Sequence, residues 1–182
     1  MIHTRAEFRV WLEENHDKMS ECWLALKRGK PVDDLHFWYL DAVEEALCFG
    51  WIDSTQRIVD GVPLQRFSPR KKNSPWSELN KGRVRQLERL GLMTDAGRMV
   101  LPDMDTEHFR VHPEIQEALE QSGAWETFLS FLPLYQRIRA YNVEFYLKRN
   151  REQYKKALAH LITETQKGHM YGEWNDYGRL LE

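Results

Sequence analysis

The dipeptide Asp60-Gly61 constrains the fold more than any other feature of this sequence, because it separates two extended runs. Asp-Gly favours a two-residue hairpin turn in which both central residues adopt positive φ. The runs Trp51–Val59 and Val62–Phe67 are therefore predicted to form antiparallel strands. Pro63 has no N–H to donate, so we expect the second strand to lie at a sheet edge or to be bulged there.

Around this hairpin, one further strand is predicted over Glu21–Lys27, and the rest of the chain has mainly helical periodicity. Ser74-Pro75 is typical of a helix start, because Ser caps exposed N–H groups and Pro fits the first turn. We predict a mostly helical α+β single domain, with a small antiparallel sheet of about three strands and a helical C-terminal third. The expected parts are an α+β core over 1–100, a helical part packed on the same domain over 101–167, and a tail over 168–182.

Composition narrows the class of function. The formal net charge of -2 gives no global attraction to nucleic acid, and no nucleic-acid partner is expected. No stretch reaches membrane-spanning length, and the N-terminal residues lack the pattern of a signal peptide. Cys22 and Cys48 have neither metal-binding nor redox spacing. A reduced, cytoplasmic protein is therefore expected, and its oligomeric state stays open.

The segment Arg66–Ser77 places four cations beside the predicted helix start, with Phe67 and Trp76 next to them. Helix N-termini and cations both favour anions, so the segment could bind a phosphate, a carboxylate or a nucleobase. The alternative is structural: Arg66 pairs with a carboxylate such as Asp53, and the lysines are solvated loop charges.

Two carboxylates are candidate general acids or bases. Glu45 and Asp53 lie close in sequence to Cys48 and Trp51, and a carboxylate near an indole can have a raised pKa. No phosphate-binding glycine loop or dinucleotide motif is present, so no cofactor is expected. His108 and His112 have helical metal-ligand spacing, but Pro113 disfavours a helix there, and no metal site is predicted.

Part of the sequence resembles a known family. The matching residues are the block Ala42–Ser54, the run Arg66–Lys71, and then Ser74, Trp76-Ser77, Asn80, Arg83-Val84, Gly91, Met93-Thr94 and Ala96-Gly97. They resemble the YdeI/OmpD-associated family, whose domain is labelled bacteriocin-protection. The resemblance implies a bacterial role in resistance to antimicrobial peptides, through association with an outer-membrane porin. It supplies no catalytic residues. It does imply that the elements around Trp51, Arg66 and Trp76 come together in the fold.

Our leading hypothesis from the sequence is a binding module for a small anionic molecule or a peptide. Arg and Trp side chains would form the cleft, and polar groups would orient the ligand. An enzyme that uses Glu45 or Asp53, and a protein-interaction surface on the charged C-terminal helices, are the alternatives. The predicted ligand-binding residues are Trp51, Asp53, Arg66, Arg70, Trp76 and Asn80.

Overall fold

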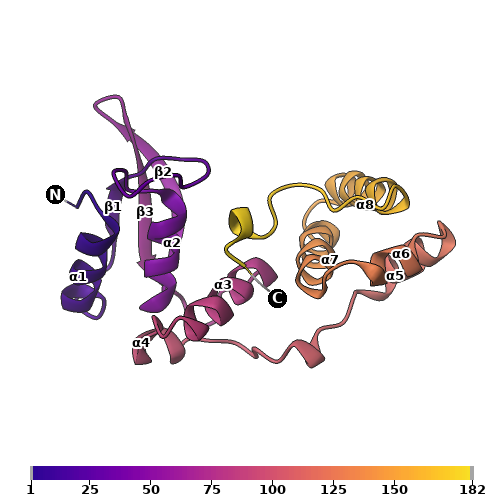
Figure 1. The fold of residues 1–182 in the computed structure, drawn as a ribbon, viewed down its shortest axis with the longest axis horizontal. Coiled ribbons are helices and arrows are strands. Elements are labelled where there is room, and N and C mark those ends of the chain that lie inside the picture. The colour runs from indigo at the N-terminus through magenta and orange to yellow at the C-terminus, as the bar shows by residue number, and fades with distance from the viewer. Residues whose placement is uncertain (1, 181–182) are drawn as a thin grey trace. The chain divides into compact units, whose positions relative to one another are not determined.

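The computed structural model describes residues 2–180, and its ribbon is drawn in Figure 1. Within those residues the chain is mostly helical with one three-stranded antiparallel sheet and a helical C-terminal part, which confirms the predicted α+β class. The strands are β1 (Cys22–Ala25), β2 (Trp51–Val59) and β3 (Val62–Pro69). The helices are α1 (Arg5–Asn15), α2 (Tyr39–Cys48), α3 (Glu78–Arg89), α4 (Asp95–Arg98), α5 (Pro113–Gln121), α6 (Trp125–Ser130), α7 (Pro133–Leu147) and α8 (Arg151–Gln166), with short 3-10 turns η1 (Thr106–His108) and η2 (Asp176–Gly178).

The β2–β3 hairpin forms as predicted. Asp60 and Gly61 adopt φ of 50° and 79°, the left-handed region that a two-residue turn of this kind requires. Figure 1 shows the hairpin as a long two-stranded arm whose tip extends past α2. The Asp-Gly pair therefore sets both the turn and the pairing register next to it.

The position of β3 corrects one expectation. The strand order is β1-β3-β2, so β3 is central and not at an edge, and no bulge occurs at Pro63. Pro63 pairs with Ile58, one step from the turn, where the pair does not exchange hydrogen bonds and the backbone N faces away from β2. On that side the β1 ladder ends at Leu64, so the missing N–H of Pro63 costs no hydrogen bond.

Helices α1 and α2 build the core of the sheet region. The ring of Phe67 in β3 packs on Phe8 of α1, with centroids 5.5 Å apart. Helix α2 is buried along its whole length from Leu40 to Cys48, and it packs on both α1 and β2. A helix buried on every side needs partners for its polar groups, and the neighbouring arginines described below supply them.

A bulge in β2 changes which side chains face α2. The register shifts between Asp53 and Gln56, which leaves Ser54 and Thr55 without direct partners in β3. Because of the extra residue, Gln56 lies opposite Gln65 and shares its face of the sheet.

Helix α3 begins later than predicted. The sequence suggested Ser74 as the cap, but the helix starts at Glu78, and Ser77 Oγ accepts the N–H of Asn80 at 3.2 Å. Ser74 instead lies in the preceding turn, where its hydroxyl donates to the carbonyl of Lys71. Two serines three residues apart can each cap a helix, and the sequence did not distinguish them.

The described chain divides into two compact units. The N-terminal unit is Met1–Pro75 with Arg83–Asp103, and the C-terminal unit is Trp76–Gly82 with Met104–Glu182. In the C-terminal unit, helices α5 to α8 enclose an apolar core that includes Ile115, Phe128 and Leu161. Of the segment predicted as a tail, residues 168–180 are described and are packed there as well, since Trp174 and Leu180 are buried with residues of α7. Residues 181 and 182 of that prediction lie outside the described residues.

Candidate functional site: a polar hollow beside Arg28

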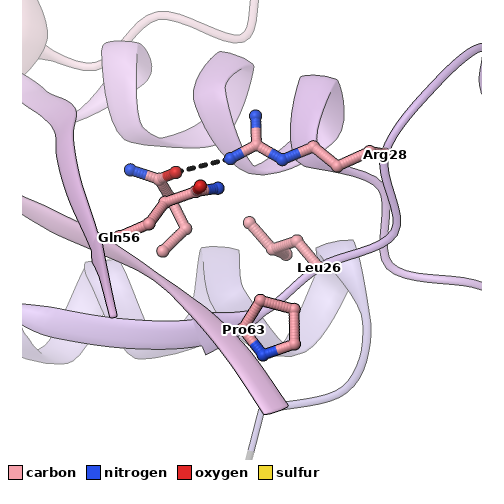
Figure 2. Close-up of a pocket in the computed structure, with 5 residues that line it drawn as sticks. Leu26, Arg28, Gln56 and Pro63 are labelled. Atoms are coloured by element: carbon pink, nitrogen blue, oxygen red, sulfur yellow. Dashed lines mark hydrogen bonds between the residues drawn. The ribbon is translucent and has the colours of Figure 1, made fainter. Parts of the chain in front are cut away.

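A hollow of about 280 Å³ opens on the N-terminal unit between the chain that follows β1 and the β2–β3 hairpin. In Figure 2 the guanidinium of Arg28 and the amide of Gln56 lie near each other, with Leu26 and Pro63 beside them. The hollow therefore combines an apolar wall with hydrogen-bonding groups. We call it the Arg28 hollow, and its lining is Leu26, Arg28, Gln56, Pro63 and Gln65.

The guanidinium of Arg28 is fixed by two contacts. Its Cζ lies 3.7 Å from the centroid of the Tyr39 ring, and Nη2 donates to Oε1 of Gln65 at 2.6 Å. Among residues 2–180, no carboxylate lies within ion-pair distance of Arg28. The cation is thus oriented by a ring and an amide, and its charge is not neutralised by a direct partner.

The side-chain amide of Gln65 holds the guanidinium of Arg28 in its orientation. Its side chain is buried, and Nε2 donates to the carbonyls of Ser54 and Thr55 at 3.1 and 3.3 Å. Both carbonyls belong to the bulge of β2, where the register assigns Ser54 and Thr55 no directly opposite residue in β3. Since the amide nitrogen is committed to carbonyls, Oε1 must face Arg28, and the orientation of the amide is determined.

Tyr39 and Asp53 extend the site towards α2. The hydroxyl of Tyr39 donates to Oδ2 of Asp53 at 2.5 Å. Burial of the phenol, and then the negative charge of Asp53, raise the pKa of Tyr39 to about 12, although Arg83 and Arg28 oppose the shift. Tyr39 therefore stays protonated at neutral pH, and its hydrogen bond to Asp53 keeps the ring stacked against the guanidinium of Arg28.

Trp51 is not the stacking surface that the sequence suggested. Its ring is 1% exposed, it packs edge-on against Trp11, and Nε1 donates to the carbonyl of His16 at 3.0 Å. Trp51 begins β2 directly after the left-handed Gly50, and at that point the strand faces the core. The residue is a core anchor with no face left for a ligand.

Arg66 and Asp53 lie on opposite faces of the sheet, so the expected pairing between them does not occur. Asp53 is opposite Phe67, the neighbour of Arg66 in β3, and side chains alternate along a strand. Arg66 instead pairs with Glu21 at 2.7 Å and donates to the hydroxyl of Ser54. The structural interpretation of Arg66 holds, but with a different carboxylate.

Arg70, Trp76 and Asn80 complete the predicted set. Arg70 is buried, and its Nη1 donates to the hydroxyl of Ser74 and the carbonyl of Pro75 at 3.1 and 3.2 Å. Its guanidinium thus stabilises the turn after β3. Trp76 and Asn80 belong to the C-terminal unit. Of the six predicted ligand-binding residues, Asp53 is linked to the Arg28 hollow, through Tyr39.

Glu45, the other candidate acid or base, is part of a buried ion network. Its Oε1 accepts from Arg5 at 2.7 Å and its Oε2 accepts from Arg9 at 2.8 Å. Arg5 also contacts Asp41 and Glu44, at 3.3 and 2.7 Å. With both oxygens held by guanidinium groups, Glu45 joins α1 to α2, and this arrangement does not favour acid–base chemistry.

The histidine pair does not share a helix. His108 lies in η1, and His112 is extended and caps α5 by accepting the N–H of Glu114 on Nδ1. Within residues 2–180, no group of three His, Cys, Asp or Glu side chains is placed to hold a metal ion. No helix in the same range is long and apolar enough to cross a membrane.

Sequence reasoning missed Arg28, Tyr39, Gln56 and Gln65. Arg28 follows Lys27 and precedes Gly29, so it resembled a solvated loop charge. The available signal was Gln65, a polar residue on the strand face that also carries Leu24 and Phe67, because a buried amide needs several partners. Without the bulge, however, neither the partners nor the position of Gln56 could be inferred.

The model of the family described as "Domain of unknown function (DUF8412)" matches residues 1–100, and the chain belongs to that family. No curated protein and no solved structure matches the chain. The matched residues include every side chain that lines the Arg28 hollow.

Proposed function

We propose that the N-terminal unit is a binding module that accepts a small oxyanion, a carboxylate or a phosphate, in the Arg28 hollow. The observation that carries the proposal is the guanidinium of Arg28, which Tyr39 and Gln65 orient without a neutralising carboxylate. An oriented guanidinium binds a carboxylate or a phosphate through two parallel hydrogen bonds, and pre-orientation lowers the entropy lost on binding.

The other lining residues support a ligand with a short apolar part. Gln56 is exposed and offers both a donor and an acceptor, whereas Leu26 and Pro63 form an apolar wall. A volume of about 280 Å³ suits a ligand of a few heavy atoms beyond the oxyanion. Short-chain carboxylates therefore fit better than a bare inorganic ion.

The test is a two-dimensional ¹H–¹⁵N NMR titration with butyrate, with neutral butyramide and with inorganic phosphate. Butyrate should shift the side-chain signals of Arg28 and Gln56, and butyramide should bind at least about tenfold more weakly because it lacks the charge. Arg28→Gln should weaken butyrate binding by a similar factor.

Arg57→Gln is the matched control. Arg57 also stacks on an aromatic ring, with Cζ 3.9 Å from the Trp23 centroid, but on the sheet face that carries Leu64 and not the hollow. Its replacement should leave butyrate affinity unchanged. Equal losses in the two variants, or no saturable shift with any of the three probes, would refute the proposal.

The resemblance to the YdeI/OmpD-associated family, the association with a porin and a cytoplasmic location remain proposals beside this one. Binding of an acidic peptide through the same guanidinium is compatible with the site, because a peptide carboxylate presents the same chemistry. The enzyme alternative has less support, since Tyr39 is held protonated on Asp53 and Glu45 is enclosed by two arginines.

A further inference from the structure

A second and larger hollow lies in the C-terminal unit, beyond the residues that the family model matches. Its volume is about 540 Å³, within the range typical of small-molecule sites. It opens between the chain around η1 and the beginnings of α6 and α7. We call it the Arg137 hollow.

One side of the Arg137 hollow is aromatic and apolar. Phe109, Trp125 and Pro133 line it. Trp125 is half-buried and stacks on the fully buried Phe128, with an interplanar angle of 25°, so the indole is held in a fixed orientation. A fixed aromatic wall favours a flat ring in the ligand.

The other side carries positive charge. Arg110 and Arg137 line the hollow together with one carboxylate, that of Glu107, and Arg137 is also paired with Glu78 outside the lining. Arg137 is 8% exposed and lies 3.6 Å from Glu78, which fixes its place, whereas Arg110 is exposed and donates from Nη1 to the carbonyl of Phe109. Cations partly removed from water attract an anion more strongly than solvated ones do.

Gln136 adds a directed acceptor. Its Nε2 donates to the carbonyls of Leu129 and Phe131 at 3.0 and 2.8 Å, so both amide hydrogens are committed. The group that Gln136 can offer to a ligand is therefore its carbonyl oxygen. A ligand with an N–H or O–H donor on its ring would use this acceptor.

From these three features we infer that the Arg137 hollow binds a flat aromatic carboxylate that carries a ring N–H or O–H donor. The ring packs against Trp125 and Phe109, the carboxylate faces Arg110 and Arg137, and the ring donor reaches Gln136. This site does not depend on the Arg28 hollow, because its lining lies entirely in the C-terminal unit.

The test uses indole-3-acetate as the probe, followed by isothermal titration calorimetry on the full chain. Three related compounds separate the contributions: indole-3-acetamide lacks the charge, 1-methylindole-3-acetate lacks the ring donor, and cyclohexylacetate lacks the flat ring. Each should bind more weakly than indole-3-acetate, and the uncharged amide should lose about tenfold in affinity.

Arg110→Gln should weaken indole-3-acetate about fivefold and leave the amide unaffected. This variant is at an exposed site and should fold normally. Arg149→Gln is the matched control, since Arg149 is also exposed and donates from Nη1 to a backbone carbonyl, that of Phe145. The inference is overturned if indole-3-acetate does not bind, if it binds no better than the amide, or if the two arginine variants behave alike.

Discussion

Two charged regions of the N-terminal unit differ in what surrounds their charges. Helix α2 buries Asp41, Glu44 and Glu45, and Arg5 and Arg9 contact them directly. Arg28 has a ring and an amide as its partners, and it lies at the edge of a hollow. Both regions carry arginine, but only α2 provides carboxylates for it.

The difference distinguishes the structural role of the α2 network from the binding role that we propose for Arg28. Buried charges cost several kcal/mol each unless a partner offsets the loss of hydration, so the α2 network is required once the helix is buried. An exposed cation has no such requirement, and an aromatic ring and an amide can orient it while its charge stays available. We therefore expect the α2 network to contribute to stability, whereas recognition is the role that we propose for Arg28.

The largest effect is expected at the end of α2. A Cβ on Gly97 would lie 2.3 Å from the carbonyl oxygen of Cys48, which also accepts from the N–H and hydroxyl of Thr94. Gly97→Ala should lower the free energy of unfolding by more than about 3 kcal/mol, because the clash is with backbone that cannot move aside. Urea unfolding followed by circular dichroism measures it.

Gly123→Ala is the control for that variant. Gly123 has φ of 68° but nothing within 4 Å of an added Cβ, so only backbone strain remains, about 1 kcal/mol. If the two substitutions cost the same, close packing at the end of α2 is not what Gly97 provides.

The next effect concerns the ion network itself. Glu45→Gln removes the charge that contacts Arg5 and Arg9, and we expect a loss of about 2–3 kcal/mol. Glu13→Gln is matched to it, because Glu13 also pairs with Arg9, at 3.5 Å, but its side chain is 53% exposed. That control should change stability by less than about 0.5 kcal/mol. A Glu45→Gln protein as stable as the control would remove the contrast between α2 and Arg28.

The sequence predicted much of the fold because local signals agreed with the final packing. Asp60-Gly61 specified a turn that needs positive φ, and both residues adopt it in the structure. The prediction for Pro63 failed because a strand can be central and still lack a neighbour at one residue. The residue at which β1 stops pairing with β3 depends on tertiary packing, and no local sequence pattern predicts it.

The candidate site was much harder to predict than the fold. The high density of cations in the sequence led to the prediction of Arg66 and Arg70 as binding residues. Strand alternation, however, places Arg66 on the opposite face of the sheet from Asp53. The guanidinium of Arg70 donates to Ser74 and Pro75 in the loop that follows it. Arg28 came from a stretch with no distinctive pattern. Its importance depends on Gln65 and on the bulge in β2, which arise only when the strands pair.

A smaller effect distinguishes Gln65, which holds Arg28 in place, from Gln56, which is exposed and available to a ligand. Gln65→Leu leaves the carbonyls of Ser54 and Thr55 and the guanidinium of Arg28 without their amide partner, so it should cost about 2 kcal/mol and weaken butyrate binding. Gln56→Leu should weaken binding with almost no change in stability, since Gln56 is exposed. Urea unfolding and the NMR titration together measure both. The assignment fails if Gln56→Leu is the more destabilising change or if neither alters binding.

The smallest effect is a pH dependence at Tyr39. Its pKa is raised to about 12 in the folded chain from an ordinary value of 10.0, so between these values the folded state keeps a proton that the unfolded state loses. The stabilising contribution is thus complete below pH 10 and declines as pH rises towards 12. Tyr39→Phe should cost about 1 kcal/mol at pH 8 and should flatten the decline in stability between pH 10 and 12. Because Tyr135, Tyr154 and Tyr171 remain in both proteins, the difference between the two urea-unfolding series isolates Tyr39. Parallel curves would mean that the hydroxyl of Tyr39 is not held on Asp53, and the ring beneath Arg28 would then lack the anchor on which its orientation depends.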